Sequence, residues 1–236
     1  HSARYIPCST LEDVFEAVLK GKVHVAVIPI ENSLQGGVGR SMDLLYESSM
    51  RVGGECYLEV AHNLCGSVDS VQDLKHLYAH HQPIEQCRRW ILENLRHVEI
   101  YESTSTAQAA QLAAKDPVGG AICNLYAAHH YGLNLLAERI EDHAGNTTRF
   151  LVLSHELNPP TGNDKTSLMF AVPHQPGALA DAMAIFKRHH LNLTFIESFP
   201  MPNTPNKYLF FVEFQGHPAD RGAERALAAL ARKTVR

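Results

Sequence analysis

The sequence predicts an α/β protein of two domains, and three observations lead to that prediction. Between residues 86 and 140, short β-prone runs alternate with helical segments, which is typical of layered folds with mostly parallel strands. The segment HELNPPTGND (residues 155–164) breaks this alternation with prolines, a glycine and polar residues, as a linker does. After it, the predicted order strand, helix, strand, strand, helix matches a ferredoxin-like split βαββαβ unit whose last strand is missing. We therefore predict domains at 1–154 and 165–236, joined by a linker at 155–164.

Local signals place the elements of the first domain. Ser9 and Glu12 have the spacing of a capping box, apolar residues follow at helical spacing, and Gly21 can close this first helix. The run VHVAVIPI (residues 23–30) has little polar content, so we expect a strand that is buried on both faces. The later predicted elements are a helix around 42–46, strands at 55–64, 98–101, 120–123 and 135–140, and helices at 86–95, 106–114 and 125–131.

The second predicted domain is a compact unit after the linker. Its apolar runs alternate between strand and helix periodicity, and each run is bounded by glycine, proline or polar residues. The predicted strands lie at 166–172, 191–197 and 207–214, and the predicted helices at 177–190 and 219–233.

Composition narrows the class of protein. The net charge of −4 carries no signature of nucleic-acid binding, and no apolar run is long enough to cross a bilayer. No secretory signal is present, and the five cysteines are odd in number and lack CxxC spacing. We therefore expect free thiols and a cytoplasmic location. Histidine pairs occur at 80/81, 129/130 and 189/190, but without HExxH or Cys/His spacing they predict no metal site.

The stretch PIENSLQGGVGRS (residues 29–41) directly follows the predicted buried strand. Polar side chains there would lie at the carboxyl edge of the sheet, where ligands bind in such folds. Three glycines would leave backbone amides accessible to an anion, although an ordinary turn with a helix cap explains the composition equally well. The candidate residues are Glu31, Asn32 and Ser33.

A second candidate is the start of a predicted helix in STSTAQAA (residues 103–110). Ser103 or Ser105 could cap this helix, and its free N–H groups and dipole would favour a carboxylate or phosphate. Simple N-capping is the alternative explanation. The candidate residues are Ser105, Thr106 and Ala107.

The third candidate is GNTTRF (residues 145–150), which begins a predicted strand. Arg149 offers a planar fork that suits a carboxylate, and threonine hydroxyls can donate to a leaving oxygen. A surface ion pair beside strand-edge threonines is the alternative. The candidate residues are Asn146, Thr148, Arg149 and Phe150.

Taken together, these segments resemble the prephenate dehydratase family over nearly the whole chain. The family pattern is seen in PCSTLEDVFEAV, VIPIENSLQGGV, YAHHQPIEQC, STAQAA, YGLNLL and NTTRFLVL. The second domain resembles the ACT regulatory domain of this family, through DKTSLMF, PGAL, NLTFIES and YLFFVEF. Several motifs in the right order make the resemblance specific.

The resemblance implies a reaction and a fold. Prephenate would lose its ring carboxylate as CO₂ and its ring hydroxyl as water, giving phenylpyruvate in phenylalanine biosynthesis, without metal or organic cofactor. The catalytic domain would have the two-lobed fold of type 2 periplasmic binding proteins, with the active site in a cleft between the lobes. Thr148 corresponds to the essential threonine of the family's TRF motif.

The ACT resemblance implies regulation and assembly. Such domains commonly pair side by side and bind an amino acid near the PGAL turn, so we expect a homodimer or homotetramer with L-phenylalanine as effector. Two departures stand out: the chain starts after the family's glycine-rich first strand, and ESRP reads ESFP here. The implied regulatory residues are Gly177, Ala178, Leu179, Glu197 and Ser198.

Two other functions remain open from the sequence. One is an arogenate dehydratase, whose substrate carries an amino group where prephenate carries a keto oxygen. The other is a non-catalytic amino-acid sensor that keeps the binding-protein cleft, which the missing first strand suggests.

Overall fold

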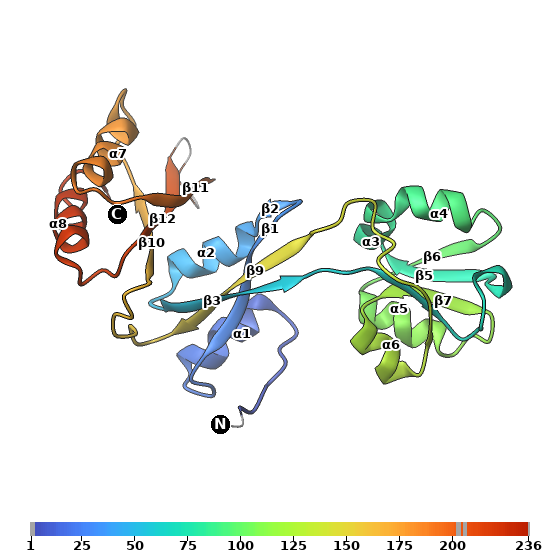
Figure 1. Ribbon diagram of the computed structural model, residues 1–236. Helices are drawn as coiled ribbons and strands as arrows, with labels where there is room; N and C mark the ends of the chain where they lie inside the picture. The colour runs from blue at the N-terminus through green and yellow to red at the C-terminus, as the bar shows by residue number, and fades with distance from the viewer. Residues whose placement is uncertain (1–2, 202–203, 205–206, 236) are drawn as a thin grey trace. The chain divides into compact units, whose positions relative to one another are not determined.

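The computed structural model describes residues 3–201, 204 and 207–235, and its chain folds into two compact units (Figure 1). The first unit comprises the residues up to 56 together with those from 149 onward, and the second unit comprises residues 57–148. The chain passes between the units twice, within strands β3 (Arg51–Glu59) and β9 (Thr147–Ser154). The order is that of a two-lobed α/β fold in which one lobe is inserted into the other and the C-terminal domain follows.

The first unit contains two sheets: one belongs to the first lobe and the other to the C-terminal domain. The first lobe is a four-stranded sheet with the helices α1 and α2. Helix α1 (Leu11–Leu19) begins one residue later than the predicted capping box implies, because Thr10 and Asp13 form the reciprocal pair in place of Ser9 and Glu12. Strand β1 was expected to be buried on both faces, but Val27 is 50% exposed because only alternate side chains enter the core. The sheet has the order β2-β1-β9-β3, with β1 at Ala26–Asn32, β2 at Gly36–Gly37 and helix α2 at Gly39–Glu47.

The C-terminal domain has the strand order of a ferredoxin-like unit. Strand β12 (Tyr208–Gln215) lies between β10 (Lys165–Ala171) and β11 (Leu193–Pro200), and both pairings are antiparallel. Val235 forms an antiparallel bridge with Ala171, on the side of β10 where this topology has its fourth strand. The two helices are α7 (Ala178–Arg188) and α8 (Arg221–Leu230), close to the predicted bounds.

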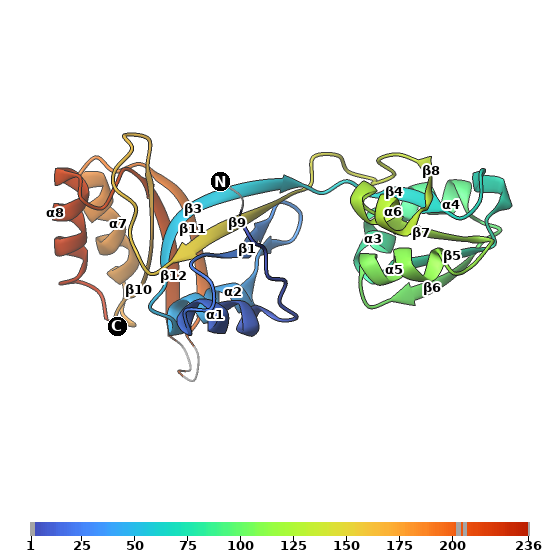
Figure 2. The ribbon, with the colours of Figure 1, turned by 90° about the horizontal axis from the view of Figure 1, so that it is seen from below.

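The sheet of this domain has two packed faces. Val212 and Phe214 join the core formed with helices α7 and α8. Phe211, which points the opposite way in the same strand, joins the core of the first lobe. Figure 2 shows the strands β10, β11 and β12 between the helices α7 and α8 and the sheet of the first lobe. Because side chains alternate along β12, residue 213 also faces the first lobe.

The second unit has helices on both faces of a mixed sheet of order β6-β5-β7-β4-β8. Strands β5, β6 and β7 are parallel, and β8 runs in the same direction, whereas β4 lies between β7 and β8 and is antiparallel to both. The expectation of mostly parallel strands is therefore confirmed for this sheet, with β4 as the reversed strand. The predicted strand 55–64 is two strands, and the predicted helix 86–95 is two helices. The bounds are β4 Asn63–Gly66, β5 His76–His80, α3 His81–Gln86, α4 Arg88–Asn94, β6 Glu99–Ser103, α5 Thr106–Ala113, β7 Gly119–Cys123, α6 Leu125–Tyr131 and β8 Asn134–Ala137, with a short 3₁₀ turn at Val71–Asp73.

Candidate functional site

The start of helix α5 lies at the carboxyl edge of the sheet in the second unit. Parallel strands β5 and β6 end together there, with His80 paired to Ser103 in the register. Ser105 is the N-cap residue, and its hydroxyl accepts a hydrogen bond of 3.1 Å from the Gln108 amide. Ser105 is exposed, so the predicted helix start is confirmed as an accessible N-terminus. Thr106 and Ala107 form its first turn.

Asn146 and Thr148 belong to the same unit. The amide of Val60 donates to the carbonyl of Asn146 over 2.8 Å, shortly before the chain enters β4. The first residue of β4, Asn63, pairs with Cys123 at the carboxyl end of β7. This part of the crossing segment therefore lies toward the edge of the sheet where α5 begins. Asn146 is buried and Thr148 is half-buried.

Glu31, Asn32 and Ser33 lie in the first unit, at the end of β1 and in the turn that follows. The side-chain oxygen of Asn32 accepts a hydrogen bond of 3.1 Å from the Leu34 amide, which shapes the turn. Asn32 then pairs with Gly36 in a two-residue strand, so the glycines form a hairpin. Ser33 is exposed, whereas Glu31 and Asn32 are half-buried.

The Gly37 amide of this hairpin already contacts an anionic group of the chain itself. The carboxylate of Glu197, on β11, accepts a hydrogen bond from the Gly37 amide. A Cβ placed at Gly37 would collide with this carboxylate, so glycine permits the close approach. Burial and the nearby charge of Glu31 raise the pKa of Glu197, against the lowering effect of the Gly37 hydrogen bond.

Arg149 lies in a cluster of charged side chains, here called the ion cluster: Glu31, Glu55, Arg149, Lys165 and Glu213. The guanidinium contacts Glu55 at 2.6 Å, Glu213 at 2.7 Å and Glu31 at 3.7 Å. Lys165 contacts Glu55 at 2.8 Å and Glu213 at 3.7 Å. Arg149 is only 5% exposed and Glu213 is 0% exposed. Arg149 was predicted to bind a substrate carboxylate. In the structure, carboxylates of the same chain already surround its guanidinium.

The sequence contains a signal for this cluster that lies outside the three candidate motifs. Glu213 is a single acidic residue inside the apolar strand YLFFVEFQ, directly between Val212 and Phe214, which are both buried. A buried carboxylate needs a cationic partner, and Arg149 and Lys165 supply two. At Glu55, partial burial raises the pKa, but the hydrogen bonds and charges of Lys165 and Arg149 outweigh it and hold the pKa of that carboxyl below its ordinary value.

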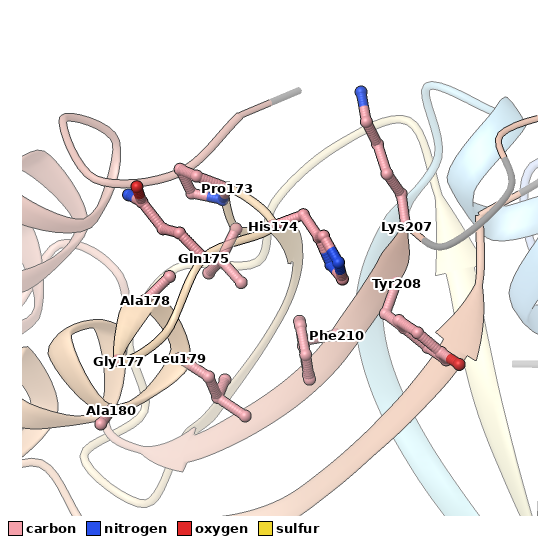
Figure 3. A pocket seen from close by; sticks show the side chains of 11 residues that line it. Pro173, His174, Gln175, Gly177, Ala178, Leu179, Ala180, Lys207, Tyr208 and Phe210 are labelled. Atoms are coloured by element: carbon pink, nitrogen blue, oxygen red, sulfur yellow. The ribbon is translucent and has the colours of Figure 1, made fainter.

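A pocket of about 280 Å³ lies in the C-terminal domain, beside the start of α7 (Figure 3). Gly177 adopts a φ of 85° at the N-cap of this helix, a conformation that favours glycine. Gly177, Ala178 and Leu179 of the PGAL turn line the pocket, together with Lys207 and Phe210.

Two predicted regulatory residues lie outside this lining. Glu197 faces Gly37 of the first lobe. Ser198 pairs with Phe210 in the ladder, next to the pocket. Their predicted roles in binding an amino acid stay predictions.

Within residues 3–201, 204 and 207–235, no group of three or more His, Cys, Asp or Glu side chains could hold a metal ion. No helix in that same part of the chain has the length and hydropathy to cross a membrane. Cys87 is buried, and burial raises the pKa of its thiol to about 12.

The family model of prephenate dehydratase matches residues 1–158, and that of the ACT domain matches residues 166–232. The chain is 40% identical over 233 residues to a bifunctional chorismate mutase/prephenate dehydratase of Aquifex aeolicus, covering 99% of this chain and 64% of that relative. It is 36% identical over 247 residues to arogenate dehydratase 2 of Petunia hybrida, covering 95% and 62%. The chain thus spans somewhat less than two thirds of these relatives.

Solved structures share the fold. The prephenate dehydratase of Arthrobacter aurescens in complex with L-Phe has a TM-score of 0.86 and 34% identity, with 97% of this chain and 78% of that chain covered. GqqA, described as a quorum-quenching acylase, has a TM-score of 0.86 and 30% identity, with 98% and 85% covered.

Proposed function

The chain belongs to the prephenate dehydratase family, and on that premise we propose that it converts prephenate into phenylpyruvate, CO₂ and water. The observation that carries the proposal is the position of the TRF motif. Thr148 is the second residue of strand β9, and Asn146, which directly precedes that strand, lies toward the sheet edge where the exposed N-terminus of α5 is found. A hydroxyl donor and an anion receptor are the two groups that this reaction requires.

The substrate explains the choice of residue types. Prephenate carries two carboxylates, so its binding needs positive potential from groups that transfer no proton. The N-terminus of α5 supplies such potential through free amides and the helix dipole. We propose that Ser105, Thr106 and Ala107 bind one carboxylate, and that Asn32, Ser33 and Asn146 hold the substrate in register.

Thr148 would act on the leaving group. A ring hydroxyl leaves slowly unless it receives a proton or a strong hydrogen bond as charge develops on its oxygen. A positioned Thr148 hydroxyl would donate that hydrogen bond, and a single donor of this kind is worth on the order of 10²–10³ in rate. Aromatisation of the ring supplies the driving force, so orientation and electrostatics suffice without covalent catalysis.

Glu31, Arg149 and Phe150 complete the predicted substrate-binding set. The predicted contact between Arg149 and a substrate carboxylate stays a prediction. The ion cluster favours a different part for this residue, because its guanidinium is balanced by Glu55 and Glu213. Phe150 follows it in β9 and is half-buried.

An ultraviolet assay for phenylpyruvate tests the proposal with three proteins. The unmodified chain should turn over prephenate. Thr148→Val, which keeps the shape and removes the hydroxyl, should lower kcat by about 10²–10³ while the circular dichroism spectrum is unchanged. Thr147→Val is the matched control in the same strand and should stay within threefold of the unmodified chain. Equal turnover by Thr148→Val and the control would remove Thr148 from this role.

The two alternatives have separate tests. Because one relative of this chain is named arogenate dehydratase 2, side-by-side kinetics on prephenate and arogenate decide substrate preference. Calorimetry that shows binding of an amino acid without any product would identify a sensor instead.

We further propose that L-phenylalanine binds in the pocket at the start of α7. Its carboxylate would face the helix N-terminus and Lys207, and its ring would pack on Leu179 and Phe210. A related structure was solved with L-Phe.

The exposed edge strand β11, with Ile196 at 50% exposure, is a surface through which two ACT domains could pair in a homodimer or homotetramer. All five cysteines are free thiols, which supports a cytoplasmic location.

A further inference from the structure

We propose that Glu213, a residue of the ACT domain, is a positioning residue for the dehydratase reaction. It would act through Arg149, which follows the catalytic threonine in strand β9. This inference rests on the proposed function of Thr148, and it extends that function by giving the regulatory domain a direct part in holding the catalytic strand.

The first step is the geometry of Arg149. Side chains alternate along β9, so Arg149 shares a face with the fully buried Leu151 and Leu153, while Thr148 points to the opposite face. Both leucines belong to the core of the first lobe, which also includes Phe211 of the ACT domain. The face of β9 that carries Arg149 is therefore packed and fixed, and the position of Thr148 depends on it.

The second step is the set of contacts that the ACT domain makes with the guanidinium. Glu213 contacts it at 2.7 Å with no exposure to solvent. The ring of Phe195, which pairs with Glu213 in the ladder between β11 and β12, has its centroid 5.9 Å from the Cζ atom of Arg149. The guanidinium thus lies over a carboxylate and an aromatic ring of the same sheet face, both of which favour a cation.

The third step is the rigidity of Glu213 itself. The Ser167 hydroxyl donates a hydrogen bond of 2.7 Å to the same Oε1 atom that contacts Arg149. Lys165 lies 3.7 Å from the other oxygen and 2.8 Å from Glu55. Ser167 and Lys165 of β10 therefore fix the side chain of Glu213, and Glu213 in turn fixes Arg149 of β9. The position of the ACT sheet thus affects the position of the strand that carries the TRF motif.

The charge balance of the ion cluster shows why the position of Arg149 depends on the charge of Glu213. Two cations, Arg149 and Lys165, face Glu55 and Glu213, with Glu31 at the margin. Removing the Glu213 charge leaves the two cations in a largely buried site with less compensation. The guanidinium would then shift toward Glu55 and Glu31 on the neighbouring strands, and β9 would shift with it.

The experiment compares Glu213→Gln with Glu224→Gln, an exposed glutamate of α8 in the same domain. We expect Glu213→Gln to lower kcat at least tenfold with KM within threefold, because a misplaced donor weakens the transition state more than substrate binding. Glu213→Asp, which keeps the charge, should recover part of kcat. Glu224→Gln should leave both constants unchanged.

Hydrogen exchange gives a readout that does not depend on turnover. The peptide covering residues 145–153 should exchange at least threefold faster in Glu213→Gln, relative to a peptide of α8, and not in Glu224→Gln. If Glu213→Gln does not fold, Ser167→Ala removes only the hydrogen bond to Glu213 and should show the same changes at a few-fold level.

The outcomes separate the two proposals. Values of kcat and of exchange within twofold of the unmodified chain in Glu213→Gln, or in Ser167→Ala where Glu213→Gln does not fold, would overturn the positioning role. Absence of prephenate turnover in the unmodified chain would overturn the proposed function, and the exchange comparison alone would then decide whether Glu213 holds β9.

Discussion

Arg149 and the start of α5 are both positive groups that suit a carboxylate, yet they have opposite surroundings. The guanidinium is 5% exposed and lies against Glu55 and Glu213, whereas Ser105 at the start of α5 is exposed to solvent. A buried cation must be compensated by the chain, since no solvent remains to do so. An exposed helix start needs no such partner, so its potential stays available to a ligand. Chemical type alone therefore does not identify a binding group.

The Gly37 amide is an intermediate case. Its hydrogen bond goes to Glu197 of the ACT domain, and that carboxylate is only partly buried. The predicted anion site in the hairpin is thus filled by a side chain that solvent can still reach. The three sites therefore form a series. Arg149 is buried and its charge is compensated, the Gly37 amide has a partner that solvent can reach, and the start of α5 is exposed to a ligand.

Removing the compensated, buried cation should have the largest effect. Arg149→Met leaves Glu213 buried with a weaker set of partners, and breaking a buried pair in this way costs about 3–5 kcal/mol of unfolding free energy. Urea unfolding measures the loss. The control is Arg40→Met, because Arg40 pairs with Glu12 on the surface, and its unfolding midpoint should not change measurably. Equal midpoints for the two variants would mean that the ion cluster is not a buried, coupled unit.

The accessible helix start should show a smaller loss of stability together with a binding effect. Ser105→Ala removes the N-cap, at a cost of about 1 kcal/mol. We expect KM for prephenate to rise about fivefold, since the first turn would no longer be held for the substrate carboxylate. Thr10→Ala removes the N-cap of α1 and serves as the matched control: it should lose similar stability without a change in KM. A KM that moves equally in both variants would show that α5 has no special part in binding.

The intermediate site should show the smallest effect, and the size of that effect depends on pH. The folded-state pKa of Glu197 is raised above its ordinary value of 4.5, so its contribution favours folding below that pH and is lost as pH rises through the folded pKa. Glu197→Gln can still accept the Gly37 hydrogen bond without a charge beside Glu31. We expect it to be more stable at pH 7 by about 0.3 kcal/mol, a small value because solvent screens the site. The gain should vanish at pH 4, and a gain of equal size at both pH values would contradict this explanation.

Local sequence determined the helix starts and the order of elements. Ser105 caps α5 and Gly132 ends α6 with a φ of 70°, because both effects act within one turn of the chain. The same short range explains the error at α1, where two capping patterns overlap by one residue and the sequence offers no means of choosing. The motifs NTTRF and PGAL also have the local settings that were predicted for them, a strand start and a helix N-terminus.

The tertiary structure alone decided which charges meet. Three strands of the first lobe carry Glu31, Glu55 and Arg149, and two strands of the ACT sheet carry Lys165 and Glu213. Glu31 and Glu213 are 182 positions apart in the sequence. Side-chain alternation predicts that Glu213 is on one face of β12, but not which partner that face covers. The partner follows from packing of the ACT sheet on the first lobe, and with it the compensation of Arg149. The amino-acid sequence thus determines the chemical type of each group, and burial in the tertiary structure determines whether that group remains available to a ligand.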